Sequence, residues 1–250
     1  MTVRLSAWRE RCRKWQEQGL EQALAYFTFI ADVTTLTADC RFAGDAETLA
    51  ARYDGLPFAA VAFYGQDAAR LAALTHRLLT PDEEFYCLVG EEQWALVQTA
   101  YSVLEVDQEW QMLFRGEPAA LDPGATAALG PPDLAEMKSL ARREGMTAFE
   151  CDPLAQRSWY GVRRQGELVA QGGTHLTLSR AVEIGNIVTA HTHRRRGYAS
   201  QVVAALVHAI HPQGKAVFLQ VFKNNAPAIA CYKQLGFEPL RTMYLARCHL

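Results

Sequence analysis

Residues 187–200 form the most informative stretch of the chain and run Ile187-Val188-Thr189-Ala190-His191-Thr192-His193-Arg194-Arg195-Arg196-Gly197-Tyr198-Ala199-Ser200. An apolar strand pattern gives way to a basic turn, and a helical pattern then begins at a glycine. The first amides of a helix have no partner within the helix and lie at its positive end. A tight entry loop lets such amides surround a phosphate, and the three arginines add positive charge. The pattern predicts an anion site at this helix start.

Other interpretations of the same residues remain open. The arginines of an ordinary strand–turn–helix connection can simply be solvated. Contact with nucleic acid is the weaker alternative, because no broad basic face and no interleaved aromatic residues accompany them. His191 and His193 have the spacing of two metal ligands, but no third ligand lies nearby in the sequence. We therefore expect neither nucleic acid nor a metal at this site.

The residues around this window predict alternating strands and helices, the arrangement of an α/β domain. A helix capped by Asp133 and ended by Gly145 opens the second half of the chain. The expected strands cover residues 159–163, 168–177, 181–190 and 216–222, and the expected helices cover 196–210 and 226–235. One or two closing strands follow to Leu250.

A second pattern follows the 216–222 strand and runs Val221-Phe222-Lys223-Asn224-Asn225-Ala226-Pro227-Ala228-Ile229-Ala230-Cys231-Tyr232-Lys233-Gln234-Leu235-Gly236-Phe237. Each of its residues has a structural interpretation as well: Asn225 as a helix cap, Gly236 as a helix end, and Phe237 and Tyr232 as core residues. Taken together, however, the two windows resemble the GNAT superfamily of N-acetyltransferases. Arg194-x-x-Gly197-x-Ala199 resembles its pyrophosphate loop, and Asn225, Ala228, Tyr232, Gly236 and Phe237 resemble its later signature. The resemblance covers about residues 131–250.

This resemblance implies a GNAT fold, with acetyl-CoA as the acyl donor and no metal. Two neighbouring parallel strands, 181–190 and 216–222, would splay apart to admit the pantetheine arm. The residues that would contact coenzyme A are Ile187, Val188, Thr189, Arg194, Arg195, Arg196, Gly197, Tyr198, Ala199, Ser200, Asn225 and Ala228. The acceptor would be the amine of a small molecule or a peptide. The implied activity is transfer of an acetyl group to a primary amine by direct attack.

Two protons must move in such a transfer. The resemblance implies Tyr232 as the acid that protonates the leaving thiolate. Glu183 is the expected base, acting through water, with His175 and Asn186 as weaker substitutes. Strand alternation places Glu183 on the same face as Ile187 unless a bulge intervenes. Two other functions stay open: a non-catalytic acyl-CoA sensor or scaffold, and an N-acyltransferase that uses a longer acyl chain.

The first half of the chain predicts a similar alternation. Helices are expected at 5–31, 67–79 and 91–103, and strands at 57–64, 85–89 and 110–114. Its nearest counterpart to the basic glycine turn, Tyr64-Gly65-Gln66-Asp67, has no arginine. The layout resembles glycine N-acyltransferase-type proteins, which join a degenerate GNAT-like half to an active one. We expect an α/β fold with a mixed sheet, divided into a non-catalytic domain at 1–117 and a GNAT domain at 118–250. The first domain would form one wall of the acceptor site.

The Pro-, Gly- and Ala-rich segment 116–132 suggested that boundary, with a short strand expected at 119–121. Composition agrees with a soluble globular protein: 250 residues, half of them apolar, with a formal net charge of −2. Six scattered cysteines without a close pair, and an N-terminus without an apolar leader, predict reduced thiols and a cytoplasmic protein with no membrane contact. The oligomeric state and the acceptor are not specified by the sequence.

Overall fold

The computed structural model describes residues 4–146 and 158–250. Its contacts divide the chain into two units, one formed by Met1–Trp110 with Leu240–Leu250 and the other by Gln111–Pro239. Two long strands, β5 (Ser102–Phe114) and β11 (Phe237–His249), contribute residues to both units. The two units describe how the chain packs, whereas the predicted boundary between residues 117 and 118 separates a non-catalytic domain from a GNAT domain. That functional boundary stays a prediction.

The second unit has the strand order β10-β9-β8-β7-β6. Its strands are β6 (Thr126–Leu129), β7 (Trp159–Arg164), β8 (Glu167–Thr177), β9 (Ala181–Thr189) and β10 (Ala216–Phe222). Its helices are α6 (Leu134–Arg143), α7 (Tyr198–Ile210) and α8 (Ala226–Gln234). Strands β6 to β9 pair antiparallel, whereas β9 and β10 are parallel and joined through α7. This mixed sheet with helices confirms the predicted α/β fold class.

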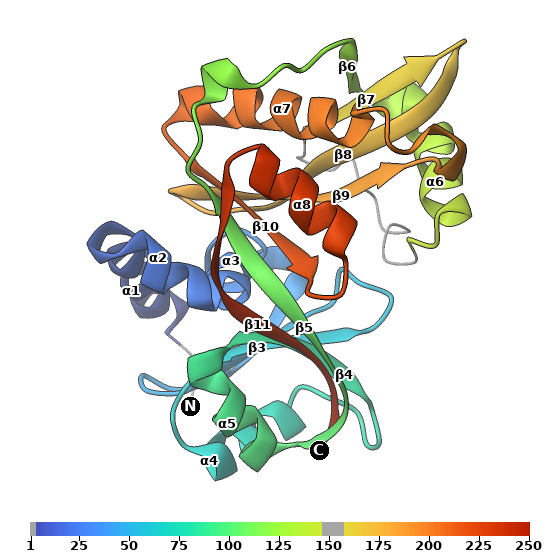
Figure 1. Cartoon of the computed structure of the whole chain (residues 1–250). Coiled ribbons are helices and arrows are strands. Elements are labelled where there is room, and N and C mark those ends of the chain that lie inside the picture. The colour runs from blue at the N-terminus through green and yellow to red at the C-terminus, as the bar shows by residue number, and fades with distance from the viewer. Residues whose placement is uncertain (1–3, 147–157) are drawn as a thin grey trace. The chain divides into compact units, whose positions relative to one another are not determined.

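Helices α6 and α7 cover opposite faces of the second unit's sheet (Figure 1). A Cβ added to Gly172 of β8 would lie 2.9 Å from Val202 of α7, so Gly172 faces that helix. On the other face, Met137 of α6 belongs to one buried apolar cluster with Trp159 and Val188. The helix expected over 196–210 has a buried apolar stripe, with Val202, Val203, Leu206, Val207 and Ile210 at 2% exposure or less, whereas Ala199 in its first turn is only partly buried.

The first unit repeats the same order of elements. It contains β1 (Cys40–Gly44), β2 (Leu49–Tyr53), β3 (Ala59–Tyr64) and β4 (Phe85–Gly90), with helices α1 (Leu5–Gln18), α2 (Leu20–Ala23), α3 (Phe27–Thr34), α4 (Ala68–His76) and α5 (Glu91–Ala100). Three antiparallel strands lead to the parallel pair β3 and β4, joined through α4, and β11 pairs antiparallel with β4. The core of this unit gathers side chains of α4 and α5 against the sheet.

Several predicted elements are wrong in detail. The helix expected over 5–31 is interrupted at Gly19, whose backbone is extended, and continues as α2 and α3. The helix expected over 91–103 ends at Ala100, and the strand expected to start at residue 110 begins at Ser102. The strand expected at 119–121 is instead a 3-10 turn at Pro118–Ala120, because Pro118 at its first position favours a helical turn. Strands β1, β2 and β6 were missed.

The structure also bears on membrane-spanning helices and on the state of the cysteines. In the part of the chain that the structure describes, no helix combines the length and the apolar character needed to cross a bilayer. The described cysteines, Cys12, Cys40, Cys87, Cys231 and Cys248, are free thiols. Cys151 lies outside the described residues, as do the first three residues of the chain.

Candidate functional site

The start of α7 has the geometry of an anion site. Gly197 precedes the helix with φ at +78°, a left-handed conformation that glycine adopts without strain, and no side chain caps this helix end. The first backbone bond of the helix runs from the amide of Gln201 to the carbonyl of Gly197. Among the described residues, the amides of residues 195–200 therefore have no acceptor, so this helix start can accept an external anion.

Open space surrounds this turn. A Cβ added to Gly197 would meet no atom of residues 4–146 or 158–250 within 4 Å. The neighbouring Arg195 also has positive φ, at +60°, which turns the chain sharply before the helix. Arg195 and Arg196 are exposed, so both predicted residues lie beside the free amides with their charges in solvent. The predicted loop residues 194–200 are thus brought together around one helix end.

Arg194 has a different environment from the one predicted. Its Nη2 atom lies 2.6 Å from Oε2 of Glu144, and its Nε donates to the carbonyl of Thr189 at 3.3 Å. The guanidinium therefore ties the loop to the end of α6 and to the strand β9. Of the three arginines, Arg194 is the one that pairs with a buried carboxylate. Its role is therefore to hold the loop in place.

Glu144 is a functional candidate that sequence reasoning missed. Its side chain is 4% exposed and its Oε1 accepts from the amide of His191 at 3.0 Å, while Nδ1 of His191 lies 3.1 Å away. Burial raises the pKa of Glu144, but the hydrogen bonds from His191 and Arg194 outweigh burial and leave the pKa below its ordinary value of 4.5. One carboxylate therefore fixes both ends of the basic turn.

Tyr198 opens α7 and is held from the neighbouring strand β7. Nε of Arg164 donates to its hydroxyl at 2.9 Å, and the guanidinium carbon lies 4.7 Å from the ring centroid. The hydrogen bond from Arg164 lowers the pKa of Tyr198. Nothing in the sequence around Arg164 marks a partner 34 residues away. Arg164 adds a further cation beside the helix start, in addition to Arg195 and Arg196.

Strands β9 and β10 open next to this loop. They pair at only three positions, at the beginnings of both strands: Ala181 with Ala216, Val182 with Val217, and Glu183 with Phe218. Beyond Glu183, β9 runs to Thr189 and β10 to Phe222 without a paired position between them. The splay expected of this strand pair is therefore present, and it leaves the β10-facing backbone edge of residues 184–189 available to an added strand.

A bulge in β9 changes which side chains share a face. Gln171 of β8 pairs with Val188, and Gly173 pairs with Gly185. An advance of two residues along β8 therefore corresponds to three residues along β9, so β9 contains one extra residue here. The extra residue is Asn186, with φ at +54°, a conformation that asparagine tolerates better than most residues. The alternation predicted from the sequence is interrupted here.

The bulge separates Glu183 from Ile187. The side chain of Ile187 lies under α7, within 2.3 Å of a Cβ placed on Gly172. Glu183 shares a face with Gly185, whose partner Gly173 faces Trp159 on the opposite side of the sheet. The expectation that Glu183 and Ile187 share a face is therefore wrong.

The second sequence pattern forms the start and body of α8. The Asn225 side chain accepts from the amide of Ala228 at 3.3 Å, so the capping interpretation of Asn225 is confirmed. Ser200 Oγ lies 3.3 Å from Cys231 Sγ, which joins the first turn of α7 to α8 one residue before Tyr232. The structure thus brings the two patterns together in space, although 31 residues separate this pair.

Tyr232 is 8% exposed, and its ring centroid lies 6.0 Å from that of Phe237. Burial, and to a smaller degree the neighbouring Cys231 thiol, raises the pKa of Tyr232 well above its ordinary value of 10. The phenol is therefore protonated at neutral pH and can donate a hydrogen bond. Both the core interpretation and the acid interpretation of this residue are compatible with that environment.

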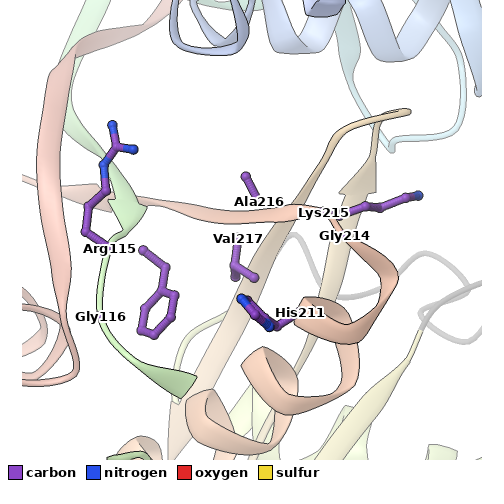
Figure 2. Close-up of a pocket in the computed structure, with 8 residues that line it drawn as sticks. Arg115, Gly116, His211, Gly214, Lys215, Ala216 and Val217 are labelled. Carbon is purple, nitrogen blue, oxygen red and sulfur yellow. The ribbon is translucent and has the colours of Figure 1, made fainter. Parts of the chain in front are cut away.

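A separate cavity of about 360 Å³ lies where β10 begins (Figure 2). Its lining residues are Phe114, Arg115, Gly116, His211, Gly214, Lys215, Ala216 and Val217, and none of the predicted site residues is among them. The side chains of Arg115 and Lys215 extend in different directions, so the cationic groups do not converge on one ligand position (Figure 2). The cavity lies beside residues that follow the C-terminal end of α7. The free amides lie at the opposite, N-terminal end of that helix.

Comparison with known proteins finds similarity to a family and to a named relative over parts of the chain. Residues 159–246 match the FR47-like protein family. A 58-residue stretch is 38% identical to the uncharacterised N-acetyltransferase YobR of Bacillus subtilis (strain 168), and it spans 23% of this chain and 24% of that relative.

Solved structures resemble the chain over most of its length. A GNAT-family acetyltransferase structure from Novosphingobium aromaticivorans DSM 12444 has a TM-score of 0.70 at 23% identity, covering 90% of this chain and 97% of that one. A GCN5-related N-acetyltransferase from Kribbella flavida has a TM-score of 0.66 at 16% identity, covering 91% and 95%. Identities this low show the fold alone. The chain therefore has the fold of these acetyltransferase structures, and its residues 159–246 are similar to the FR47-like protein family.

Proposed function

We propose that the chain is an N-acetyltransferase that moves the acetyl group of acetyl-CoA to a primary amine by direct attack. The observation that carries this proposal is the opening between β9 and β10 beside the uncapped start of α7. An elongated ligand with a strongly anionic end suits that arrangement. Its anion would meet the free amides of residues 195–200, and its arm would lie along the unpaired edge of β9.

Each predicted donor-binding residue has a place in this proposal. The amides of Gly197, Tyr198, Ala199 and Ser200 would hold the pyrophosphate, and Arg195 and Arg196 would add charge from solvent. The backbone of Ile187, Val188 and Thr189 would pair with the pantetheine and polarise the thioester carbonyl. Asn225 and Ala228 would contact the ligand from the first turn of α8. Arg194 would act mainly through the loop, because Glu144 already holds its guanidinium.

Tyr232 was predicted to protonate the leaving thiolate, and the proton affinities of the two groups limit it to donating a hydrogen bond. A coenzyme A thiol resembles a free cysteine, with a pKa near 8.5, so tyrosinate binds a proton more tightly than the thiolate by at least ~1.5 pKa units, about 2 kcal/mol. The burial of Tyr232 widens this gap. Its hydroxyl would therefore stabilise the developing thiolate by donating a hydrogen bond, and the sulfur would take its final proton when the product meets solvent.

On the other side of the reaction, the attacking amine must lose a proton. Glu183 was predicted to accept it through water. The side chain of Glu183 is 4% exposed, so an amine cannot reach the carboxylate directly. A proton arrives at Glu183 only through an intermediary, either a water molecule or the imidazole of His175.

Thiol release from acetyl-CoA in the presence of a panel of small primary amines and short peptides tests the proposed function. Amine-dependent release is expected, with the acetylated amine as the second product. Binding of acetyl-CoA without release on any amine would instead identify an acyl-CoA sensor or scaffold. Release that is faster from longer acyl-CoA donors than from acetyl-CoA would identify an acyltransferase with a different donor.

The same proposal places the protein in the cytoplasm. The described cysteines are free thiols, which persist in reducing compartments. Fractionation of cells that express the protein at its native level, followed by detection in the cytoplasmic fraction, is the expected result. Accumulation in a membrane or an exported fraction would contradict it.

A further inference from the structure

The carboxylate of Glu183 faces a histidine that the proposed reaction has not yet used. Oε2 of Glu183 lies 2.9 Å from Nδ1 of His175 on the neighbouring strand β8. The two side chains differ sharply in exposure: that of Glu183 is 4% exposed, whereas that of His175 is 45% exposed. The pair therefore joins a buried carboxylate to a solvent-facing imidazole.

The sheet irregularities create this contact. Thr174 pairs with Ile184 and Thr177 pairs with Val182, so three steps on β8 face two steps on β9. The extra residue lies between Thr174 and Thr177, where His175 is located. His175 lies against Gly185, because a Cβ on Gly185 would be in ordinary van der Waals contact with His175, 3.5 Å from its Cβ. The imidazole thus packs over β9 beside the point where β9 and β10 part.

The environment of Glu183 favours a role through His175. A buried carboxylate is costly without a hydrogen-bond partner. Among the described residues, no group donates a well-aligned hydrogen bond to Oε2 of Glu183, and Nδ1 of His175 is at hydrogen-bond distance but misaligned. Such contacts commonly tighten only when substrate is bound. A modest rotation of the exposed imidazole would give Glu183 its missing donor.

We propose that His175 is the catalytic base of the acetyl transfer and that Glu183 is its positioning residue. This inference rests on the proposed function. Glu183 accepts from Nδ1–H, which fixes the neutral tautomer with a free electron pair on Nε2. Nε2 has no partner among the described residues and lies across the ring from the carboxylate.

The proton balance of the step is complete with groups already named. The amine nitrogen attacks the thioester carbonyl, the C–N bond forms, and the C–S bond breaks. The proton lost by the amine nitrogen moves to Nε2 of His175, and the charge of the resulting imidazolium is compensated by Glu183. The sulfur leaves as a thiolate that Tyr232 stabilises. His175 then returns its proton to solvent, which its exposure allows.

Three variants test this assignment in the full-length protein: His175→Ala, Glu183→Gln and, as a matched control, His211→Ala. His211 is another exposed histidine of the same unit, located after the opposite end of α7 from the free amides. We measure amine-dependent thiol release, affinity for coenzyme A by calorimetry, and the thermal midpoint of each variant. Removal of His175 should lower kcat by about 10²–10⁴-fold, the range for general base catalysis. Coenzyme A affinity should be unchanged, and His211→Ala should match the wild type.

Chemical rescue separates catalysis from structure. Added imidazole should restore part of the turnover of His175→Ala, because the site is exposed, and should not restore Glu183→Gln. His175→Ala with wild-type turnover would overturn this inference and leave the proposed function standing. Loss of turnover without rescue, matched by an equal loss in Glu183→Gln, would also overturn it and return the base to Glu183 acting through water. A wild-type protein that releases no thiol with any amine would overturn both.

Discussion

Glu144 is a residue whose contribution depends on its charge. Its ionised carboxylate accepts from the His191 amide and pairs with Arg194, and these bonds lower its pKa below 4.5. A group whose pKa is lowered by folding stabilises the fold above its unfolded pKa, and this stabilisation disappears as the pH falls through the folded value. The contribution of Glu144 is therefore complete at neutral pH and declines below about pH 4.5.

We predict that Glu144→Gln lowers the free energy of unfolding at pH 7 by about 1.5–3 kcal/mol, the contribution of hydrogen bonds to a charged group. The difference from the wild type should shrink as the pH falls from 5 to 3. Denaturant unfolding at several pH values measures it. Glu136→Gln is the matched control on α6, because Glu136 is half-exposed in its pair with Arg163 and surface pairs contribute about 0–1 kcal/mol. Equal effects of both substitutions at pH 7 would contradict the prediction.

Tyr232 can be tested without disturbing the core. Tyr232→Phe keeps the ring that packs near Phe237 and removes only the hydroxyl. If that hydroxyl stabilises the leaving thiolate, kcat should fall by roughly 10²–10³-fold, the loss expected when one hydrogen-bond donor to a developing anion is removed, while the affinity for acetyl-CoA stays the same. Steady-state kinetics with calorimetric titration of the donor separates the two quantities. Nearly full turnover in the variant would make Tyr232 a core residue.

At the scale of the element, the start of α7 combines backbone strain with open space. An alanine at Gly197 would have to adopt φ near +78°, which costs about 1–2 kcal/mol, but its Cβ would meet no atom of the described residues within 4 Å. Gly214, after the other end of the same helix, has φ at +68° and the same open surroundings. Gly197→Ala and Gly214→Ala therefore impose the same strain at the two ends of one helix.

We predict that both alanine variants lose similar thermal stability and that only Gly197→Ala loses affinity for acetyl-CoA. The added methyl group at residue 197 would occupy the space proposed for the pyrophosphate. Calorimetry with acetyl-CoA, alongside thermal unfolding, measures the two effects separately. Equal donor affinity in the two variants would remove the α7 start from the binding site.

The elements of the second unit could be predicted because each carries a local signal. The helix expected over 196–210, the strand expected over 216–222 and the Asn225 cap all depend on neighbours within a few residues, and the structure contains all three, with the helix starting two residues later. Strands β1 and β2 were missed because neither five-residue segment contains a β-branched residue, the type that marks a strand. The start of β5 was misassigned because Val103 also continues the apolar pattern of α5.

The site was less predictable than the elements around it, because its geometry depends on long-range contacts. Glu144 meets His191 across 47 residues, and nothing at the end of α6 signals that contact. The Gly185-Asn186 pair was the available signal for the bulge, since both residues tolerate unusual backbone angles, but the register of β8 is needed to locate it. The same register brings His175 to Glu183.

At the scale of the whole molecule, both units contain a parallel strand pair that opens after a short paired stretch. In the first unit, β3 and β4 pair only at Ala59 with Phe85 and Ala60 with Tyr86. Here the free backbone is already used by the protein, because Nε2 of the buried Gln93 donates to the carbonyl of Phe63 at 3.0 Å. The first unit therefore fills with its own side chain a position that the second unit leaves open.

The helix that follows the first strand of each parallel pair also begins differently in the two units, and again the first unit uses its own side chain where the second leaves backbone groups free. The Asp67 side chain caps α4 by accepting from the amide of Arg70 at 3.0 Å, whereas α7 begins at Gly197 without a side-chain cap. Glu91 and Glu92 occupy the first turn of α5, where they would repel a phosphate. We predict that each full-length chain binds one acetyl-CoA, through the second unit alone.

Calorimetric titration of the full-length protein with acetyl-CoA measures this stoichiometry, and Gly197→Ala assigns the site. One site per chain is expected in the wild type, and its affinity should fall in the variant. Two equivalent sites would contradict this prediction. A ligand in the first unit would need the Phe63 carbonyl and the first amides of α4, so Gln93 and Asp67 would have to give up their hydrogen bonds to these groups. One site that is insensitive to Gly197→Ala would place the donor in the first unit and contradict the charge argument, since a phosphate there would bind beside carboxylates.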